Sequence, residues 1–314
     1  MAPQVVLLFP GQGSQKPGMG RDLAWAYPSA AEVFRTMDAT LGLELTSLAF
    51  EGPEEELTRT LNAQPVLLAH SAAVWSVVRQ RVAPHVVAAA GHSLGEFTAY
   101  HAAGALGLTE AIGLVRRRGE LMWETGNARP GAMAAILGDL HAPIEVICEE
   151  ATLAAGLVVP ANYNSPGQIV ISGEVAGVEM AMELAKAAGA KRAIKLNVSG
   201  AFHSPLMEPA EEGLQQALSN ANIGNAAFPV YANVSAEPTK WQVSIMHRLS
   251  RQLTRPVQWT GAVSRMAAAY PAALYVEMGP GSVLSGLVRK IAPSVTTMTC
   301  GTPAEVEHLL ARVG

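Results

Sequence analysis

The sequence predicts an α/β fold, in which helices pack on a largely parallel sheet. Short apolar runs, such as residues 5–9 and 86–90, alternate along the chain with longer amphipathic helical patterns. Hydrophobic residues make up 49% of the composition but aromatic residues only 5%, so small aliphatic side chains fill much of the core. A chain of 314 residues can form one large domain or two smaller ones.

The composition argues against several classes of function. The net charge is −4 and no long basic block occurs, so we expect no nucleic-acid partner. Cys148 and Cys300 lie far apart without a C-x-x-C spacing, so we expect neither a metal site nor a disulfide framework. We find no signal-like N-terminal segment and no apolar run near the roughly 20 residues that span a bilayer. The sequence therefore predicts a cytoplasmic protein without a membrane segment.

The first part of the chain alternates strands and helices. The predicted strands are residues 5–9 and 86–90, and the predicted helices are residues 21–39, 65–82, 96–106 and 109–124. Thr109 is the expected N-cap of the last of these helices. Residues 127–131, Asn-Ala-Arg-Pro-Gly, then interrupt the helical pattern, and the register of the apolar residues changes after them.

Residues from about 131 to 198 follow the order β-α-β-β-α-β. The pieces are residues 132–137, 144–155, 158–162, 168–172, 175–188 and 193–198. This is the order of a ferredoxin-like unit, four strands with two helices on one face. We therefore expect an inserted ferredoxin-like subdomain at 127–198, and a large subdomain formed by 1–126 and 199–314.

After the insertion, the chain returns to the large subdomain. We expect strands at 230–234 and 273–277, and a helix at about 240–253 between them. The sequence Met-Gly-Pro-Gly at 278–281 leads into a last major helix.

The most informative motif is Gly91-His92-Ser93-Leu94-Gly95, a G-x-S-x-G sequence between a predicted strand and a predicted helix. Strand, tight turn and helix form the context of a nucleophile elbow, in which the serine projects at the tip. The glycines leave room for the sharp turn. The alternative is a glycine-flanked turn whose serine only caps the helix.

A serine nucleophile needs a base, and His203 is the best candidate among the eight histidines. It lies in a loop after an apolar strand, where functional residues concentrate. His92 adjoins the serine, but adjacent side chains in a tight turn usually point apart. No Asp or Glu is marked by pattern as the partner of His203. The site is therefore expected to use a dyad, with the histidine held by a backbone carbonyl or an amide. Glu96 is close to the serine in sequence and could have a different role in the site.

The glycine-rich loop at 10–15 matches neither a P-loop nor a dinucleotide-binding fingerprint. Gln12 lies between two glycines at a strand end, where it can bring a backbone N–H close to a substrate. With the N–H of Leu94, it would form an oxyanion hole. The alternative is a turn without a functional role.

Three consecutive arginines occupy residues 116–118 of a predicted helix. On a helical wheel, Arg118 falls within the apolar stripe of Ala111, Ile112, Val115 and Met122, while the other two arginines lie on either side. A buried arginine is costly without an anion. Arg118 is therefore expected to pair either with an internal glutamate or with a substrate carboxylate, which its planar guanidinium can grip at two points.

Several motifs in collinear order extend over nearly the whole chain. They are residues 9–15 (FPGQGSQ), 91–96 (GHSLGE), 118–119 (RG), 164–168 (NSPGQ), 200–204 (GAFHS), Gln252 with 256–259 (PVQW), and 277–281 (EMGPG). With them the chain resembles the malonyl-CoA:acyl-carrier-protein transacylases, including the discrete trans-acting acyltransferases of polyketide assembly lines. The resulting fold class is α/β, with an α/β-hydrolase-like large subdomain that holds a parallel sheet and a nucleophile elbow, plus the inserted ferredoxin-like small subdomain.

The resemblance implies a role for each matching residue. Ser93 would carry the acyl group, His203 would be its base, and the backbone carbonyl of Gln252 would orient that base. The N–H groups of Gln12 and Leu94 would form the oxyanion hole. The substrate-binding residues would be Arg118 on the malonyl carboxylate, Met122 and Phe202 around the acyl pocket, and His92. A Phe before the histidine tends to accompany malonyl rather than methylmalonyl substrates, because the ring fills the space of an α-methyl group.

The implied reaction is a ping-pong transfer of malonyl from CoA to the phosphopantetheine thiol of an acyl carrier protein, for fatty-acid or polyketide synthesis. It needs no metal or redox cofactor, and a monomer is expected. An acidic carrier would require a local basic patch on this acidic chain. The candidate is Lys186, Lys191, Arg192 and Lys195, which otherwise form an ordinary solvated surface.

Two other functions remain open at this point. A serine hydrolase, such as a thioesterase, would use the same elbow and dyad. A docking protein with an inactive site would need none of the chemistry, but the complete set of Gln12, Ser93, Arg118, His203 and Gln252 argues against it.

Overall fold

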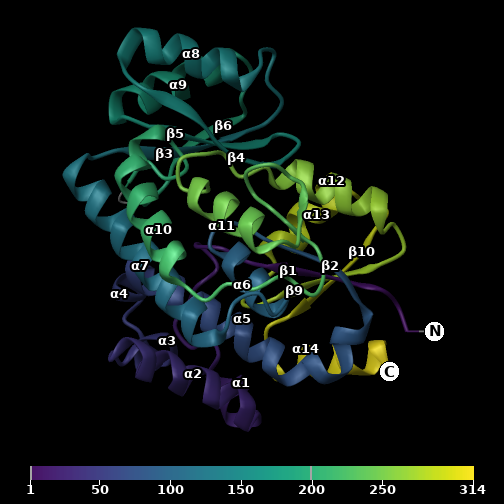
Figure 1. Cartoon of the computed structure of the whole chain (residues 1–314). Helices are drawn as coiled ribbons and strands as arrows, with labels where there is room; N and C mark the ends of the chain where they lie inside the picture. Colours follow the sequence, from purple (N-terminus) through teal and green to yellow (C-terminus); the bar gives the residue numbers. More distant parts are fainter. Residues whose placement is uncertain (1, 199) are drawn as a thin grey trace.

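The computed structural model describes residues 2–198 and 200–314, and its larger part is built around a six-stranded sheet (Figure 1). The strands are β1 Val5–Phe9, β2 Val86–Gly91, β7 Val230–Tyr231, β8 Pro238–Thr239, β9 Leu274–Met278 and β10 Thr296–Cys300. Their order is β10-β9-β1-β2-β7-β8. Neighbours run parallel, except that β8 pairs antiparallel with β7. The predicted α/β fold is confirmed.

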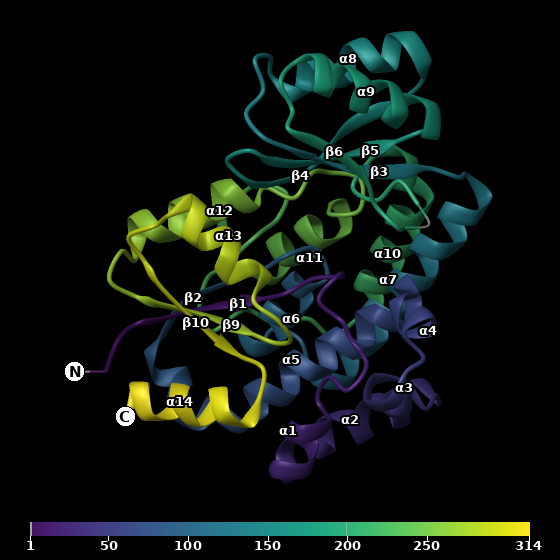
Figure 2. The ribbon, with the colours of Figure 1, turned by 180° about the vertical axis from the view of Figure 1, so that it is seen from behind.

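Helices cover both faces of this sheet (Figures 1 and 2). The α-helices outside the insertion are α1 Arg21–Ala26, α2 Pro28–Leu41, α3 Leu45–Glu51, α4 Glu54–Thr58, α5 Thr60–Val82, α6 Gly95–Ala102, α7 Leu108–Ala128, α10 Glu208–Asn220, α11 Gln242–Arg251, α12 Trp259–Ala269, α13 Val283–Ile291 and α14 Pro303–Val313. Short 3-10 helices occupy Ala83–His85 and Pro205–Met207.

Strand β1 explains why helices are needed on both sides. Successive side chains of a strand point to opposite faces, and all five of its residues are buried. Val5, Leu7 and Phe9 join the core formed with α2, α5, α6 and α7. Val6 and Leu8 join a second core, formed with α12 and α13. A strand that is apolar at every position therefore lies at the centre of a three-layer arrangement.

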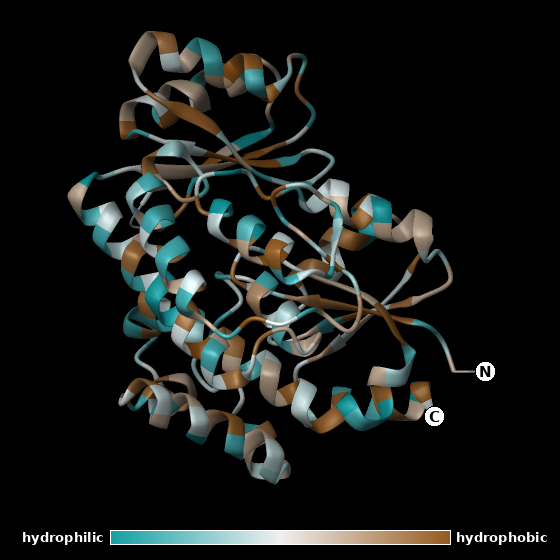
Figure 3. Ribbon diagram, in the orientation of Figure 1, coloured by the Kyte–Doolittle hydropathy of each residue, from teal (hydrophilic) through white to brown (hydrophobic). Residues whose placement is uncertain are grey.

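The second sheet is antiparallel throughout. It consists of β3 Ala132–Leu137, β4 Val158–Ser165, β5 Gln168–Gly173 and β6 Arg192–Lys195, in the order β4-β5-β3-β6. Helices α8 Ile144–Ala155 and α9 Val175–Ala187 pack on one face over a separate apolar core. Figure 3 shows the apolar strands beneath these two helices. The strand order is that of the expected ferredoxin-like unit.

The other face of this small sheet meets the large core. Met133, Ala161 and Val170 belong to the same buried cluster as residues of α5 and α7. We propose residues 127–198 as the inserted subdomain and 1–126 with 199–314 as the large one. Residues 1 and 199, at which two of these boundaries fall, lie outside the described residues.

Several expected elements differ in the structure. The helix expected at 21–39 is divided at Tyr27, because Pro28 disfavours a helical conformation in the residue before it. Thr109 lies inside α7, whose N-cap is Gly107 without a side-chain cap. The strand expected at 230–234 is only two residues long. Helix α13 is not the last, since β10 and α14 follow it.

Within the described part of the chain, no helix combines the length and the apolar character that crossing a membrane requires.

Candidate active site

The turn between β2 and α6 has the geometry of a nucleophile elbow. Ser93 at its tip has a φ of 51°, a left-handed conformation that is rare for a non-glycine residue. A Cβ atom on Gly91 would lie 1.9 Å from the carbonyl group of Gly95. A Cβ atom on Gly95 would lie 2.1 Å from the carbonyl oxygen of Phe9. Both glycines are therefore required by the tightness of the turn and its contact with β1.

His203 lies against the serine, as predicted. Its Nε2 is 2.9 Å from Ser93 Oγ, and its Nδ1 is 2.8 Å from the backbone carbonyl oxygen of Gln252. A carbonyl oxygen can only accept, so Nδ1 carries the proton and Nε2 is free to accept one from the serine. Burial, and next the charge of Arg118, lower the pKa of His203 to about 3, which keeps the imidazole neutral.

Arg118 is buried at the same place, with 1% of its surface exposed. Its Nη2 donates to Ser93 Oγ at 3.0 Å and to Gln252 Oε1 at 2.8 Å, while Nη1 donates to Gln64 Oε1 at 2.8 Å and lies 3.2 Å from Met122 Sδ. Burial lowers its pKa to about 9, so it remains a cation at neutral pH. Among the described residues, no carboxylate lies within 4.0 Å of this guanidinium.

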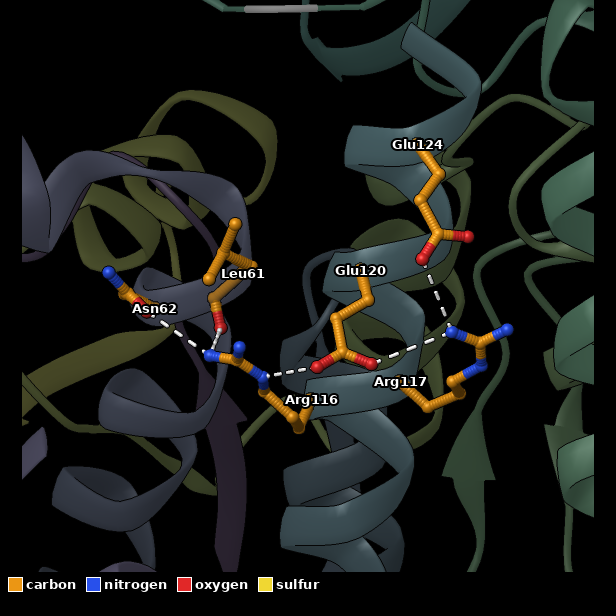
Figure 4. A network of polar contacts seen from close by, with 6 residues as sticks. All are labelled: Leu61, Asn62, Arg116, Arg117, Glu120 and Glu124. Carbon is orange, nitrogen blue, oxygen red and sulfur yellow. Dashed lines mark hydrogen bonds and ion pairs between the residues drawn. The ribbon is translucent and has the colours of Figure 1, made fainter. Parts of the chain in front are cut away.

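The other two arginines of the run make polar contacts with a different set of residues, Leu61, Asn62, Glu120 and Glu124 (Figure 4). Arg116 donates to Glu120 at 2.7 Å and to Asn62 at 3.1 Å, and Arg117 lies 3.6 Å from Glu120 and 3.5 Å from Glu124. These are partly exposed pairs of the kind that contribute little to stability. The helical wheel therefore distinguished the buried arginine correctly from its neighbours.

Gln12 and Leu94 face the cavity with their backbone N–H groups free. In the described part of the chain, neither N–H has a hydrogen-bond acceptor. The side chain of Gln12 donates instead to Thr60 Oγ1 at 3.2 Å, which ties the glycine-rich loop to α5. Free donors at the N-terminus of a helix favour negative charge.

A cavity of about 330 Å³ connects these groups and lies between the two sheets. Ser93, His203, Arg118, Gln12 and Leu94 contribute to its floor, and Met122, Phe202 and His92 also line it. The small subdomain closes the other side with Met133, Asn162 and residues 196–198. Within residues 2–198 and 200–314, no three His, Cys, Asp or Glu side chains gather as ligands for a metal ion.

The position of His92 agrees with the expectation that neighbouring side chains diverge. Its Nε2 is 2.8 Å from Oδ1 of Asn164 in β4, so the imidazole connects the elbow to the small subdomain. Burial lowers its pKa.

Sequence reasoning missed Asn233 and the side chain of Gln252. Asn233 lies two residues after the end of β7 and hydrogen-bonds to both sides of the elbow: its Oδ1 accepts from Ser93 N at 2.7 Å, and its Nδ2 donates to Gly91 O at 2.7 Å. Gln252 Nε2 donates to Ser93 O at 2.9 Å and to Glu96 at 2.7 Å. A polar residue at the end of a buried parallel strand was the signal for Asn233, because strand ends position functional groups in such sheets.

Comparisons with known proteins agree with this geometry. The family model described as acyl transferase domain matches residues 6–305. The malonyl CoA-acyl carrier protein transacylase of Bacillus subtilis is 46% identical, over 97% of this chain and 95% of the relative. The protein of that name from Escherichia coli K12 is 43% identical, over 98% and 99% of the two chains.

Solved structures give the same result. The acyl-carrier-protein S-malonyltransferase of Bartonella henselae has a TM-score of 0.94 at 41% identity and covers 99% of both chains. A malonyl transacylase solved in complex with its type II polyketide synthase acyl-carrier protein has a TM-score of 0.93 at 40% identity, over 98% of this chain and 99% of that one. The chain therefore belongs to the acyl transferase domain family.

Proposed function

We propose that this chain transfers a malonyl group from CoA to the phosphopantetheine thiol of an acyl carrier protein, through a malonyl ester of Ser93. The activity named for the similar proteins supports this reaction. The observation on this chain that carries it is a buried cation beside the nucleophile: Arg118 Nη2 lies 3.0 Å from Ser93 Oγ and has no carboxylate partner among the described residues. A substrate with its own carboxylate supplies that partner.

In the first half-reaction, His203 Nε2 takes the proton of Ser93 as Oγ attacks the malonyl thioester carbonyl. The N–H groups of Gln12 and Leu94 donate to the oxygen on which negative charge develops. The C–S bond then breaks, and His203 returns the proton to the leaving CoA sulfur. Arg118 meanwhile holds the far carboxylate of the malonyl group.

In the second half-reaction, the thiol of the carrier's phosphopantetheine gives its proton to His203 Nε2 and attacks the ester carbonyl. The same two N–H groups stabilise the second tetrahedral intermediate. When the C–O bond breaks, the proton passes from His203 to Ser93 Oγ and the free serine returns. This chemistry needs only the two substrates and proceeds without a metal ion or redox cofactor.

The small subdomain offers a surface for the acidic carrier. In the predicted basic cluster, Lys186 pairs with Glu183 and Lys195 with Glu179. Lys191 and Arg192 are exposed and form no ion pair within the described residues. We propose that these two residues contribute the charge that attracts the carrier. The proposed setting is a monomer in the cytoplasm.

The test is intact-protein mass spectrometry after mixing with malonyl-CoA or acetyl-CoA, followed by addition of holo carrier protein. We expect a malonyl adduct on the wild type that passes to the carrier, and none on Ser93→Ala. Arg118→Ala should lose about 100-fold in the rate of malonyl transfer but little in acetyl transfer, since a charge-assisted pair is worth about 1.5–3 kcal/mol. Arg116→Ala is the matched control and should behave as wild type.

An unchanged malonyl preference in Arg118→Ala would contradict the carboxylate role. Release of free malonate in the presence of the carrier would favour a serine hydrolase. An unreactive Ser93 would favour a non-catalytic docking protein.

A further inference from the structure

Glu96 is a buried acid that the proposed reaction does not use. It lies in the first turn of α6 and has no exposed surface. In the described part of the chain, no lysine, arginine or histidine lies within ion-pair distance of it. A buried carboxyl group is costly unless it is hydrogen-bonded, so the stability of this one depends on the donors around it.

Two donors meet on one oxygen of this carboxyl group. Glu96 Oε2 accepts from Gln252 Nε2 at 2.7 Å and from the backbone N–H of Asn233 at 3.1 Å. Its Oε1 has no partner among the described residues. The two donors lie on separate segments, one after α11 and one after β7, so a single oxygen joins both segments to the elbow helix.

The first connection leads to Arg118. The amide nitrogen of Gln252 donates to two acceptors, Glu96 Oε2 and Ser93 O, and neither of these atoms can donate in return while the carboxyl group is ionised. The amide oxygen must therefore point the other way, where it accepts from Arg118 Nη2 at 2.8 Å. Glu96 thus helps to fix which end of the Gln252 amide faces the guanidinium.

The second connection leads to the nucleophile. The backbone N–H of Asn233 is held by Glu96, and the side chain of the same residue bonds both Ser93 N and Gly91 O. This route affects Ser93 regardless of the acyl group. The route through Gln252 also touches Ser93 O, but in addition it reaches Arg118, whose charge acts only on a substrate that carries a carboxylate.

We propose that Glu96 is a positioning residue for acyl selectivity, which orients the Gln252 amide so that Arg118 is held ready for a substrate carboxylate. The proposal rests on the proposed function. The proposal predicts a selective effect, in which loss of Glu96 impairs malonyl transfer more than acetyl transfer. A residue needed only for folding would impair both equally.

The experiment measures kcat/KM for acylation of Ser93 by malonyl-CoA and by acetyl-CoA in Glu96→Ala and Glu96→Gln. We expect Glu96→Ala to lower the malonyl value about 30-fold and the acetyl value about 3-fold, so the selectivity falls about tenfold. Glu96→Gln keeps an acceptor oxygen for Gln252 and should recover the selectivity to within about twofold of wild type.

Glu277→Ala is the matched control. Glu277 is also fully buried, but it accepts from the backbone N–H groups of Leu284 and Ser285 at the start of α13. Its removal should change the malonyl and acetyl values by the same factor. In an Arg118→Ala background, Glu96→Ala should bring no further loss of selectivity, because the guanidinium that the Gln252 amide would position is then absent.

Equal losses for both substrates in Glu96→Ala, or no recovery in Glu96→Gln, would overturn the proposal. If Glu96→Ala does not fold, Glu96→Asp withdraws the acceptor by one methylene while keeping the charge, and the same selective loss is expected. Failure of the proposed function is a different result, since the wild type itself would then form no malonyl adduct.

Discussion

Two strand–turn–helix units flank β1 in the large sheet, and only one of them carries the candidate chemistry. The elbow joins β2 to α6, and a second turn at 279–282 joins β9 to α13. Each contains glycines, and each has a buried glutamate, Glu96 in the first and Glu277 in the second. Strand, glycine turn and helix are thus common to both units.

The units differ in what the acid does. Glu277, in β9, accepts from the N–H groups of Leu284 and Ser285, so two N–H groups at the start of α13 have an acceptor within the same strand–turn–helix unit. Glu96 instead accepts from Gln252 and Asn233, and the N–H of Leu94 beside the serine has no acceptor among the described residues. The unit with the candidate chemistry is therefore the one in which an N–H group at the helix N-terminus has no acceptor. Its glutamate hydrogen-bonds to other segments of the chain and not to that helix end.

Replacement of the turn serines tests the comparison most strongly. Ser93→Ala should lower malonyl transfer about 10³-fold or more, because it removes the hydroxyl that His203 and Arg118 contact and that is proposed to carry the acyl group. Ser282→Ala, at the N-cap of α13, should stay within about twofold of wild type. Single-turnover transfer from labelled malonyl-CoA measures both. Appreciable transfer by Ser93→Ala would mean that the acyl group is carried elsewhere.

Replacing a turn glycine by alanine should lower the free energy of unfolding more in the elbow than in the turn before α13. Gly91→Ala places a Cβ atom 1.9 Å from the Gly95 backbone, and we expect a loss of about 3 kcal/mol or more in the free energy of unfolding. Gly281 has a φ of 85° but open space around it, so Gly281→Ala should cost only about 1–2 kcal/mol. Urea denaturation gives both values. Equal losses would contradict the view that the close approach of the Gly95 backbone makes Gly91 the more costly glycine to replace.

Asn233→Ala removes two hydrogen bonds that hold the elbow but leaves the side chains of Ser93 and His203 in place. The variant leaves the N–H of Ser93 without its acceptor, a loss of about 1–3 kcal/mol for a buried group. We expect kcat/KM to fall about 10- to 100-fold for malonyl-CoA and acetyl-CoA alike. Wild-type rates for both substrates would indicate that the elbow keeps its conformation without this side chain.

The smallest effect concerns pH. The pKa of His203 is lowered to about 3, chiefly by burial, so its imidazole remains a free base throughout the range where an ordinary imidazole protonates near pH 6.5. Burial raises the pKa of Glu96 to about 7, so the test uses acetyl-CoA and the Glu96→Gln variant, in which that carboxyl group is absent. Acylation of Ser93 in this variant should not slow as the pH falls from about 7 to about 5. A rate that halves near pH 6.5 would contradict the lowered pKa.

The same shift predicts an opposite trend for stability. Because the folded-state pKa is depressed, the unfolded chain binds more protons below pH 6.5, so this contribution is complete above pH 6.5 and is lost as the pH falls towards about 3. The difference in unfolding free energy between wild type and His203→Gln isolates it. Other titrating groups, Glu96 among them, remain in both proteins.

The sequence predicted those parts of the molecule that depend on local pattern. The elbow, the β-α-β-β-α-β order and the burial of Arg118 each follow from periodicity or from glycine spacing. The two-residue strand β7 and the bonds made by Asn233, Gln252 and Glu96 could not be predicted in this way. They depend on segments more than 130 residues apart meeting at the elbow, as in the pairs Ser93–Asn233 and Glu96–Gln252.

The close contact between Gly95 and Phe9 has a consequence for how the enzyme can evolve. A Cβ atom on Gly95 would lie 2.1 Å from the Phe9 oxygen, so the start of α6 packs against the end of β1 through backbone atoms. The end of β1 is also paired with the end of β2 through the backbone. The two N–H donors that follow these strands therefore keep their spacing whatever side chains surround them. Met133 and Asn162, by contrast, reach the cavity from the small sheet. Mutation there can adjust which acyl groups are accepted while the reactive geometry stays fixed.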